Sequence, residues 1–231
     1  IRMISYLHSK RRIERRLREY ITSAPTRVER EESTREKVVK ESLEYKDGSM
    51  FEKKYNSDGT TEIKTVNSDK TYDIKKIDSN GKILEQTWTS KDGTIRRQIT
   101  NSDGTYSRHT EDADGRVRDS VLNKNKIMTS QTEVRPDGSK QYFVRNADGS
   151  TNITEYRADG SIRAVDNRPD GTYNKVIYDK NGRIVEQSWS DTNGTISTQK
   201  TNSDGTYSRH IVENNGTYRD LVIDKNNRLV S

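Results

Sequence analysis

The chain has 231 residues, of which 27% are hydrophobic and 34% are charged, and its formal net charge is +6. This composition is too polar for a conventional buried core of that length, and taken alone it favours disorder. The absence of cysteine excludes disulfides and cysteine-based metal sites. No apolar run is long enough for a transmembrane helix, and no signal peptide is visible.

Residues 1–25 are predicted to form a basic amphipathic helix. Ile13, Leu17, Tyr20 and Ile21 recur at helical spacing. The same stretch carries five arginines that could dock on an acidic surface: Arg11, Arg12, Arg15, Arg16 and Arg18. We expect either a helical cap with a solvated basic face or a docking helix. Nucleic acid, a tubulin-like polymer and an anionic membrane are alternative targets of such a helix.

Residues 26–37 are charged and show no apolar period, so they are predicted to form a linker or a short helix. Ser33 and Glu36 have the spacing of a capping box. Val38 to Tyr45 is the first expected strand, and it leads into the turn at Asp47-Gly48.

Residues 38–231 are predicted to form a β-hairpin repeat with a period of 11 or 12 residues. All 14 glycines of the chain fall on one ladder: Gly48, Gly59, Gly81, Gly93, Gly104, Gly115, Gly138, Gly149, Gly160, Gly171, Gly182, Gly194, Gly205 and Gly216. Lys70, Lys126 and Asn227 complete it, and Asp or Asn precedes every position. This pattern is typical of a type I turn closed by a glycine bulge, a common hairpin connection.

The strands between these turns predict an extended single-layer antiparallel meander of about 17 strands. Counted from the residue after each turn glycine, positions 2 and 7 are mostly apolar, and the positions between them are mostly polar. The turn should set position 7 of one strand opposite position 2 of the next, as in Val66–Tyr72, Ile77–Ile83, Tyr178–Ile184, Trp189–Ile196 and Ile223–Leu229. Because positions 2 and 7 point to opposite faces, neither face is apolar throughout, which argues against a sandwich.

A longer repeat is superimposed on the ladder, covering about residues 72–128 and 173–230. The nine residues Asn101 to His109 return unchanged at Asn202 to His210, which is 101 residues and nine turns later. Because nine is odd, the second copy should begin at the opposite edge of a sheet. A ligand site duplicated on one edge is therefore not expected.

Few residues have the pattern of a catalytic or metal site. His109 and His210 are read as polar cross-strand residues, and no histidine cluster accompanies them. Asp112-Ala113-Asp114-Gly115 resembles the start of a calcium loop but lacks the remaining ligands. Asn152, Asn193 and Asn215 begin glycosylation sequons, which matter only in a secreted chain. We therefore predict a non-enzymatic protein without a cofactor or a metal.

The segment Tyr178-Asp179-Lys180-Asn181-Gly182-Arg183-Ile184 resembles a YD repeat, the unit found in Rhs toxins and teneurins. Ile77 to Ile83 and Ile223 to Leu229 are partial versions. In that family the repeats form strands that spiral into a hollow shell around a cargo. The resemblance implies a β-meander and a non-catalytic role.

The functional hypothesis is a structural or interaction protein, a basic ribbon that docks along or builds a larger assembly. An acidic filament such as a microtubule wall is the expected partner, self-association is a further option, and an intracellular location is favoured. Nucleic acid is not the expected partner, because cross-strand pairing already accounts for the aromatic residues. The alternative is a piece of a secreted YD/Rhs-like protein, either a toxin shell or an adhesin.

Overall fold

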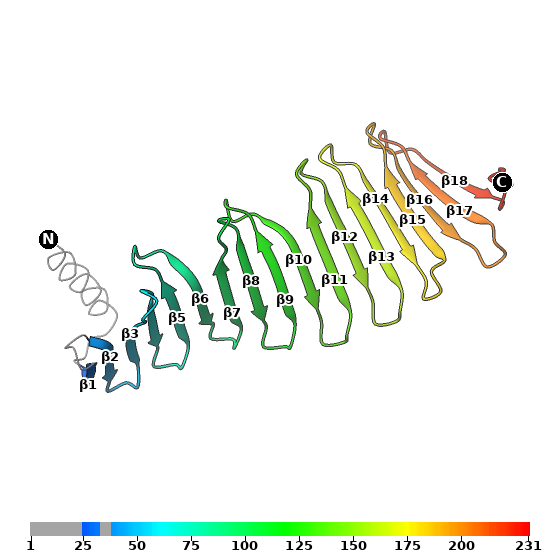
Figure 1. The fold of residues 1–231 in the computed structure, drawn as a ribbon. Helices are drawn as coiled ribbons and strands as arrows, with labels where there is room; N and C mark the ends of the chain where they lie inside the picture. The colour runs from blue at the N-terminus through cyan, green and yellow to red at the C-terminus, as the bar shows by residue number, and fades with distance from the viewer. Residues whose placement is uncertain (1–24, 33–37) are drawn as a thin grey trace. The chain divides into compact units, whose positions relative to one another are not determined.

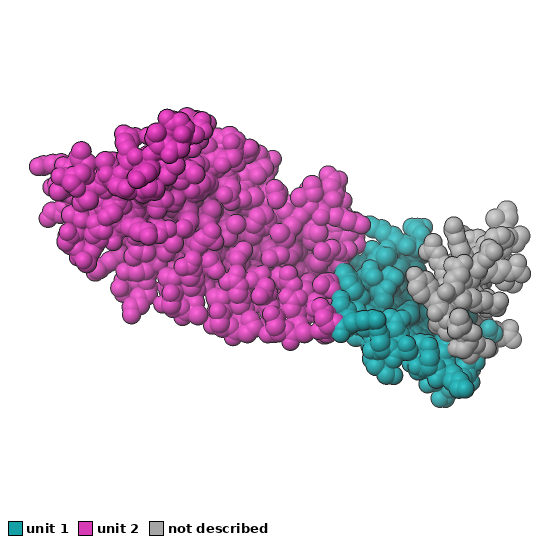
Figure 2. Space-filling view, turned by 180° about the vertical axis from the view of Figure 1, so that it is seen from behind, with its two compact units in different colours: residues 1–91 teal, residues 92–231 magenta. Residues whose placement is uncertain are grey.

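The computed structural model describes residues 25–32 and 38–231, and their regular secondary structure is entirely β. The chain folds as two compact units, an N-terminal unit (residues 1–91) and a C-terminal unit (residues 92–231) (Figures 1 and 2). The helix predicted for residues 1–25 lies outside the described residues, apart from Pro25, which begins the first strand. The five docking arginines also lie outside them.

The N-terminal unit contains six strands: β1 (Pro25–Glu32), β2 (Val38–Tyr45), β3 (Met50–Tyr55), β4 (Thr61–Val66), β5 (Tyr72–Ile77) and β6 (Ile83–Thr89). The C-terminal unit contains twelve: β7 (Ile95–Thr100), β8 (Tyr106–Glu111), β9 (Val117–Leu122), β10 (Met128–Val134), β11 (Lys140–Arg145), β12 (Thr151–Tyr156), β13 (Ile162–Asn167), β14 (Tyr173–Tyr178), β15 (Ile184–Ser190), β16 (Ile196–Thr201), β17 (Tyr207–Val212) and β18 (Tyr218–Ile223). The 17 strands expected from the ladder correspond to β2–β18.

Strand β1 corrects the sequence prediction, which placed a linker or short helix over residues 26–37. Its ladder with β2 sets Arg27 opposite Glu44, and it sets Arg30 opposite Glu41. Opposite charges directly across an antiparallel pair stabilise it. The charges that obscured any apolar period are therefore cross-strand partners on an edge strand.

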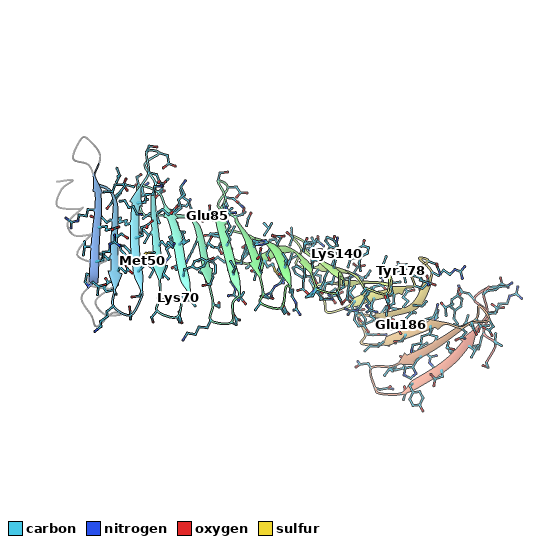
Figure 3. All side chains as sticks on the ribbon, turned by 90° about the horizontal axis from the view of Figure 1, so that it is seen from below. Met50, Lys70, Glu85, Lys140, Tyr178 and Glu186 are labelled. Carbon is cyan, nitrogen blue, oxygen red and sulfur yellow. The ribbon has the colours of Figure 1, made fainter. Side chains whose placement is uncertain are left out.

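Each unit is a single-layer antiparallel meander in which every strand pairs with the next along the chain. Side chains project from both faces of each sheet (Figure 3). In the C-terminal unit the strand direction rotates from β7 to β18, as the twist of sheets requires (Figure 3). Among the described residues, no large side chain is completely buried, and the buried apolar ones are few and scattered: Tyr45, Phe51, Leu122, Val165, Val176 and Ile223.

The turns have one backbone geometry throughout the ladder. Every glycine has φ between +79° and +88°. In the turn that precedes β8, Gly104 N–H donates to the Asn101 carbonyl at 3.0 Å, and Asn101 N–H donates to the Thr105 carbonyl at 2.8 Å. These two bonds are those of a type I turn followed by a glycine bulge. Lys70, Lys126 and Asn227 adopt the same left-handed conformation, with φ of 69°, 62° and 64°.

Aspartates cap most of these turns. Asp58 accepts hydrogen bonds from the hydroxyl of Thr60 at 2.6 Å and from its N–H at 2.9 Å. These bonds, first from the hydroxyl and then from the N–H, lower the pKa of Asp58 to about 2. Equivalent bonds lower the pKa of five further turn aspartates: Asp47, Asp69, Asp103, Asp148 and Asp204. The Asp-Gly-Thr/Ser sequence therefore fixes both the turn and the start of the next strand.

Four turns use a different cap, and three of them are the YD-like motifs. Asp179 accepts hydrogen bonds from the N–H groups of Asn181 and Arg183, at 2.8 and 2.9 Å. Asp78, Asn123 and Asp224 hold their turns in the same way. The cap has thus moved from the third turn residue to the first.

The first three of these turns each precede a seven-residue strand that contains a bulge: β6, β10 and β15. These strands account for the three 12-residue spacings of the ladder, because a bulge inserts one extra residue. The pairs Val66–Tyr72, Ile77–Ile83, Tyr178–Ile184 and Ile223–Leu229 are confirmed. The Trp189–Ile196 prediction is wrong. Ile196 pairs with Ser190 and Trp189 pairs with Ser197, because the bulge in β15 shifts the register by one residue.

In the part of the chain that the structure describes, no helix is long and apolar enough to cross a membrane.

Candidate binding surfaces

The duplicated nonapeptide forms the centre of a side-chain network on β7, β8 and β9. Arg108 donates two hydrogen bonds to Gln98 Oε1, at 2.7 and 3.3 Å. On the next strand, Arg118 forms an ion pair with Asp112 at 2.5 Å. These contacts couple three consecutive strands through exposed and half-buried polar groups.

His109 belongs to the same region and lies between two carboxylates. Its Nδ1 is 2.7 Å from Asp119 Oδ1, and its Nε2 is 3.0 Å from Glu111 Oε1. When the imidazole is protonated, both ring nitrogens can donate. The hydrogen bond to Asp119, followed by the one to Glu111, therefore raises the pKa of His109 above its ordinary value.

The second copy rebuilds most of this network on β16, β17 and β18. Arg209 donates to Gln199 Oε1 at 2.6 and 3.0 Å. His210 Nδ1 is 2.7 Å from Asp220 Oδ1. Arg219 forms an ion pair with Glu213 at 2.6 Å, as Arg118 does with Asp112. The repeat in sequence is therefore also a repeat of contacts.

Two substitutions distinguish the second copy from the first. Val212 stands where the first copy has Glu111, so His210 faces one carboxylate instead of two. Tyr218 stands where the first copy has Val117, and its ring centroid is 5.7 Å from that of His210. The second copy also places Arg209 over the Trp189 ring, 5.4 Å from its centroid.

The two copies present their histidines on opposite faces of the C-terminal unit. Paired residues share a face and successive residues alternate. The register puts Tyr106, Leu122 and Met128 on one face, while Val117, which pairs with Glu111, is on the other. The second position of each strand thus changes face at every repeat. Over nine repeats this alternation puts His109 on one face and His210 on the other, in agreement with the reversal expected from the odd number of turns.

An open groove of about 410 Å³ surrounds the His109–Asp119 pair. Its polar side is formed by Arg97, the pair itself and Thr132, and its apolar side by residues that include Ile99, Val121, Tyr142 and Val144. Tyr142 and Val144 are 40% and 44% exposed, which is high for apolar side chains on central strands. A second open groove, of about 380 Å³, contains His210 and Asp220 on the opposite face. Each copy of the repeat therefore hollows one face of the sheet.

An ion network around Arg135 was not anticipated from the sequence. Arg135 donates to Glu133 at 2.7 Å, to Glu155 at 2.9 Å and to Gln141 at 3.0 Å. The hydrogen bond from Arg135 lowers the pKa of Glu155, and Arg157 and Arg163 add to this effect. The network holds β10, β11 and β12 together from one turn. Only the sheet register brings these charges together, so no local sequence signal identifies them.

The described residues contain no group of three or more His, Asp or Glu side chains placed to hold a metal ion. Asp112 and Asp114, the start of the calcium-like sequence, form ion pairs with Arg118 and Arg116. Asp114 Oδ1 also accepts a hydrogen bond from the Arg116 N–H at 3.0 Å. These aspartates therefore act in a turn.

Comparison with known proteins gives little beyond the fold. No protein-family model matches the chain, and no curated protein matches it. Among solved structures, it is similar to a protein of unknown function from Bacteroides caccae, with 12% sequence identity and a TM-score of 0.22. That alignment covers 90% of this chain and 93% of the other.

Proposed function

We propose that this chain is a non-enzymatic interaction protein that docks along an extended acidic assembly, such as a microtubule wall. The observation that supports this proposal most directly is the accessibility of both sheet faces. Thin sheets with open, partly apolar grooves on opposite faces suit contact with a large surface, and a single-layer sheet has no enclosed interior for a substrate.

The charge distribution assigns a different role to each part of the chain. Residues 1–24 contain seven Lys and Arg and two Glu, a net charge of +5 out of a total of +6, which leaves +1 for residues 25–231. The two sheets are therefore nearly neutral. In this proposal the first 24 residues supply the electrostatic attraction to an acidic partner, and the sheets supply the contact surface.

A co-sedimentation assay with stabilised microtubules tests this proposal. Five arginines are changed to Gln in the full-length chain: Arg11, Arg12, Arg15, Arg16 and Arg18. Because exposed ion pairs contribute about 0.2–1 kcal/mol each, the five substitutions together should weaken binding at least about fivefold. Binding of the unmodified chain should also fall steeply between about 50 mM and about 200 mM salt.

A control variant removes the same charge from exposed turn and loop lysines: Lys46, Lys82, Lys124, Lys180 and Lys225. This variant should bind nearly as well as the unmodified chain. Failure of the unmodified chain to bind microtubules at low salt would exclude this partner. Equal weakening in both five-residue variants would refute the role given to the first 24 residues.

The YD-like turns support a second proposal, a piece of a secreted YD/Rhs-like repeat protein. The three YD-like motifs share one aspartate cap, and two of them precede a bulged strand. Peptide mapping of the native protein tests this proposal. A longer array of the same repeats around these residues, with a secretion signal, supports it, and the absence of further repeats contradicts it.

A further inference from the structure

Four Asn-Gly pairs occupy turns of the ladder: Asn80-Gly81, Asn181-Gly182, Asn193-Gly194 and Asn215-Gly216. An asparagine followed by glycine is chemically labile, because the glycine has no side chain to hinder attack by its own backbone nitrogen. That nitrogen loses its proton and bonds to the asparagine side-chain carbonyl carbon, and ammonia leaves. Water then opens the resulting succinimide to aspartate or isoaspartate.

The backbone does not distinguish the four sites. In each turn the glycine N–H donates to the carbonyl of the first turn residue, at 2.9–3.0 Å. Each glycine also has nearly the same φ, between +79° and +85°. Any difference in reactivity must therefore come from the asparagine side chains.

The side chains of Asn193 and Asn215 are held by hydrogen bonds. Asn193 Oδ1 accepts a hydrogen bond from the Thr195 N–H at 2.9 Å. Asn215 Oδ1 accepts bonds from both the N–H and the hydroxyl of Thr217, at 3.0 and 2.7 Å. Cyclisation requires the side-chain carbonyl to turn towards the glycine nitrogen, so these bonds must first break.

The side-chain carbonyls of Asn80 and Asn181 accept no hydrogen bond within the described residues. In these turns the cap is Asp78 or Asp179, so the asparagine contributes only its backbone N–H. The one polar group near either side chain is the Asp179 carboxylate, which lies close to the amide nitrogen of Asn181. Both asparagines are exposed.

We propose that Asn80 and Asn181 are sites of spontaneous deamidation to aspartate and isoaspartate, and that Asn193 and Asn215 are protected. Moving the cap to the first turn residue frees the asparagine that precedes the glycine. Isoaspartate adds a backbone carbon to a turn whose geometry depends on two N–H groups meeting one carboxylate. Modification at Asn80 or Asn181 therefore disrupts a YD-like turn and adds a negative charge to it.

The test is incubation of the full-length folded chain at mildly alkaline pH, with peptide mapping by mass spectrometry and isoaspartate detection. Asn80 and Asn181 should convert first. One hydrogen bond contributes about 1 kcal/mol, so Asn193 should convert about fivefold more slowly. Asn215, with two such bonds, should be the slowest of the four.

Two controls separate structural protection from local sequence. In concentrated urea the four sites should convert at similar rates, because each asparagine precedes glycine and the caps are lost. In the folded Thr217→Val variant, which keeps the N–H and loses the hydroxyl, Asn215 should accelerate to the rate of Asn193. Faster conversion of Asn193 or Asn215 than of Asn80 and Asn181 in the folded chain would overturn the proposal. The same order of rates in urea as in the folded chain would also overturn it.

Discussion

The two copies of the nonapeptide show how one sequence can be used on both faces of a sheet. Residues 101–109 and 202–210 are identical, and both make the same arginine–glutamine and histidine–aspartate contacts. They nevertheless point to opposite faces of the C-terminal unit. The local sequence therefore sets the contacts, while the number of repeats between the copies sets the direction in which they face.

The largest expected effect comes from the turn glycines at the start of each copy. Gly104 and Gly205 have φ of 85° and 83°, which a β-branched residue does not tolerate. Gly104→Val and Gly205→Val should each destabilise the adjacent hairpin by about 2 kcal/mol. Hydrogen exchange of the β8 and β17 amides measures the loss in each place.

Ser102→Ala and Ser203→Ala are the matched controls, because these residues lie in the same turns without a left-handed φ. They should change stability little. A valine tolerated at one glycine only would mean that the two turns are not equivalent.

A smaller effect of opposite sign is expected at the ladder positions that lack glycine. Lys126 and Asn227 occupy corresponding places in the two copies and are both left-handed. Because asparagine tolerates this conformation better than lysine, Lys126→Gly should stabilise the β9–β10 turn by about 0.5–1 kcal/mol, and Asn227→Gly should contribute less.

Local hydrogen exchange around each turn provides the measurement. The Lys126 ammonium is 6.0 Å from the centroid of the Tyr106 ring, a contact that the glycine variant loses. A net loss of stability in Lys126→Gly would show that this contact outweighs the backbone strain.

The smallest expected effect concerns the one carboxylate that the copies do not share. Glu111→Val gives the first copy the residue of the second and should lower the pKa of His109 towards its ordinary value. An NMR titration of the histidine rings detects the change, with the His210 signal as the internal control. An unchanged pKa of His109 would mean that Asp119 alone raises it.

The sign of the pH dependence follows from the raised pKa. His109 binds its proton more tightly in the folded chain than in the unfolded one, so its contribution to stability is fully present below the usual histidine pKa of about 6.5. This contribution is lost as the pH rises through the folded-state pKa. It should be smaller in Glu111→Val than in the unmodified chain.

Much of the fold could be predicted from the sequence because its information is local. An Asp-Gly turn with a fixed number of residues before the next one determines where a strand begins, where it ends and which strand it pairs with. The errors arose where a non-local partner decided the structure. Strand β1 exists because β2 offers opposite charges, and Trp189 pairs with Ser197 because of a bulge that the spacing of 12 signals only indirectly.

The candidate surfaces were less accessible to sequence reasoning. His109 and His210 were correctly placed on strands, but their aspartate partners come from the next strand, ten residues away. The Arg135 network joins residues up to 20 positions apart. A repeat of 11 residues fixes such distances in principle, yet the choice of partner depends on which face each side chain occupies.

By itself, the sequence determined the turns, the approximate strand boundaries and the reversal between the two copies, since these follow from backbone preferences and counting. Only the tertiary structure decided which side chains meet across strands, where the sheet is hollowed and which asparagines are held by hydrogen bonds. The physical reason is that turn geometry is set by a few adjacent residues, whereas contacts on a sheet depend on register, and a single bulge changes the register.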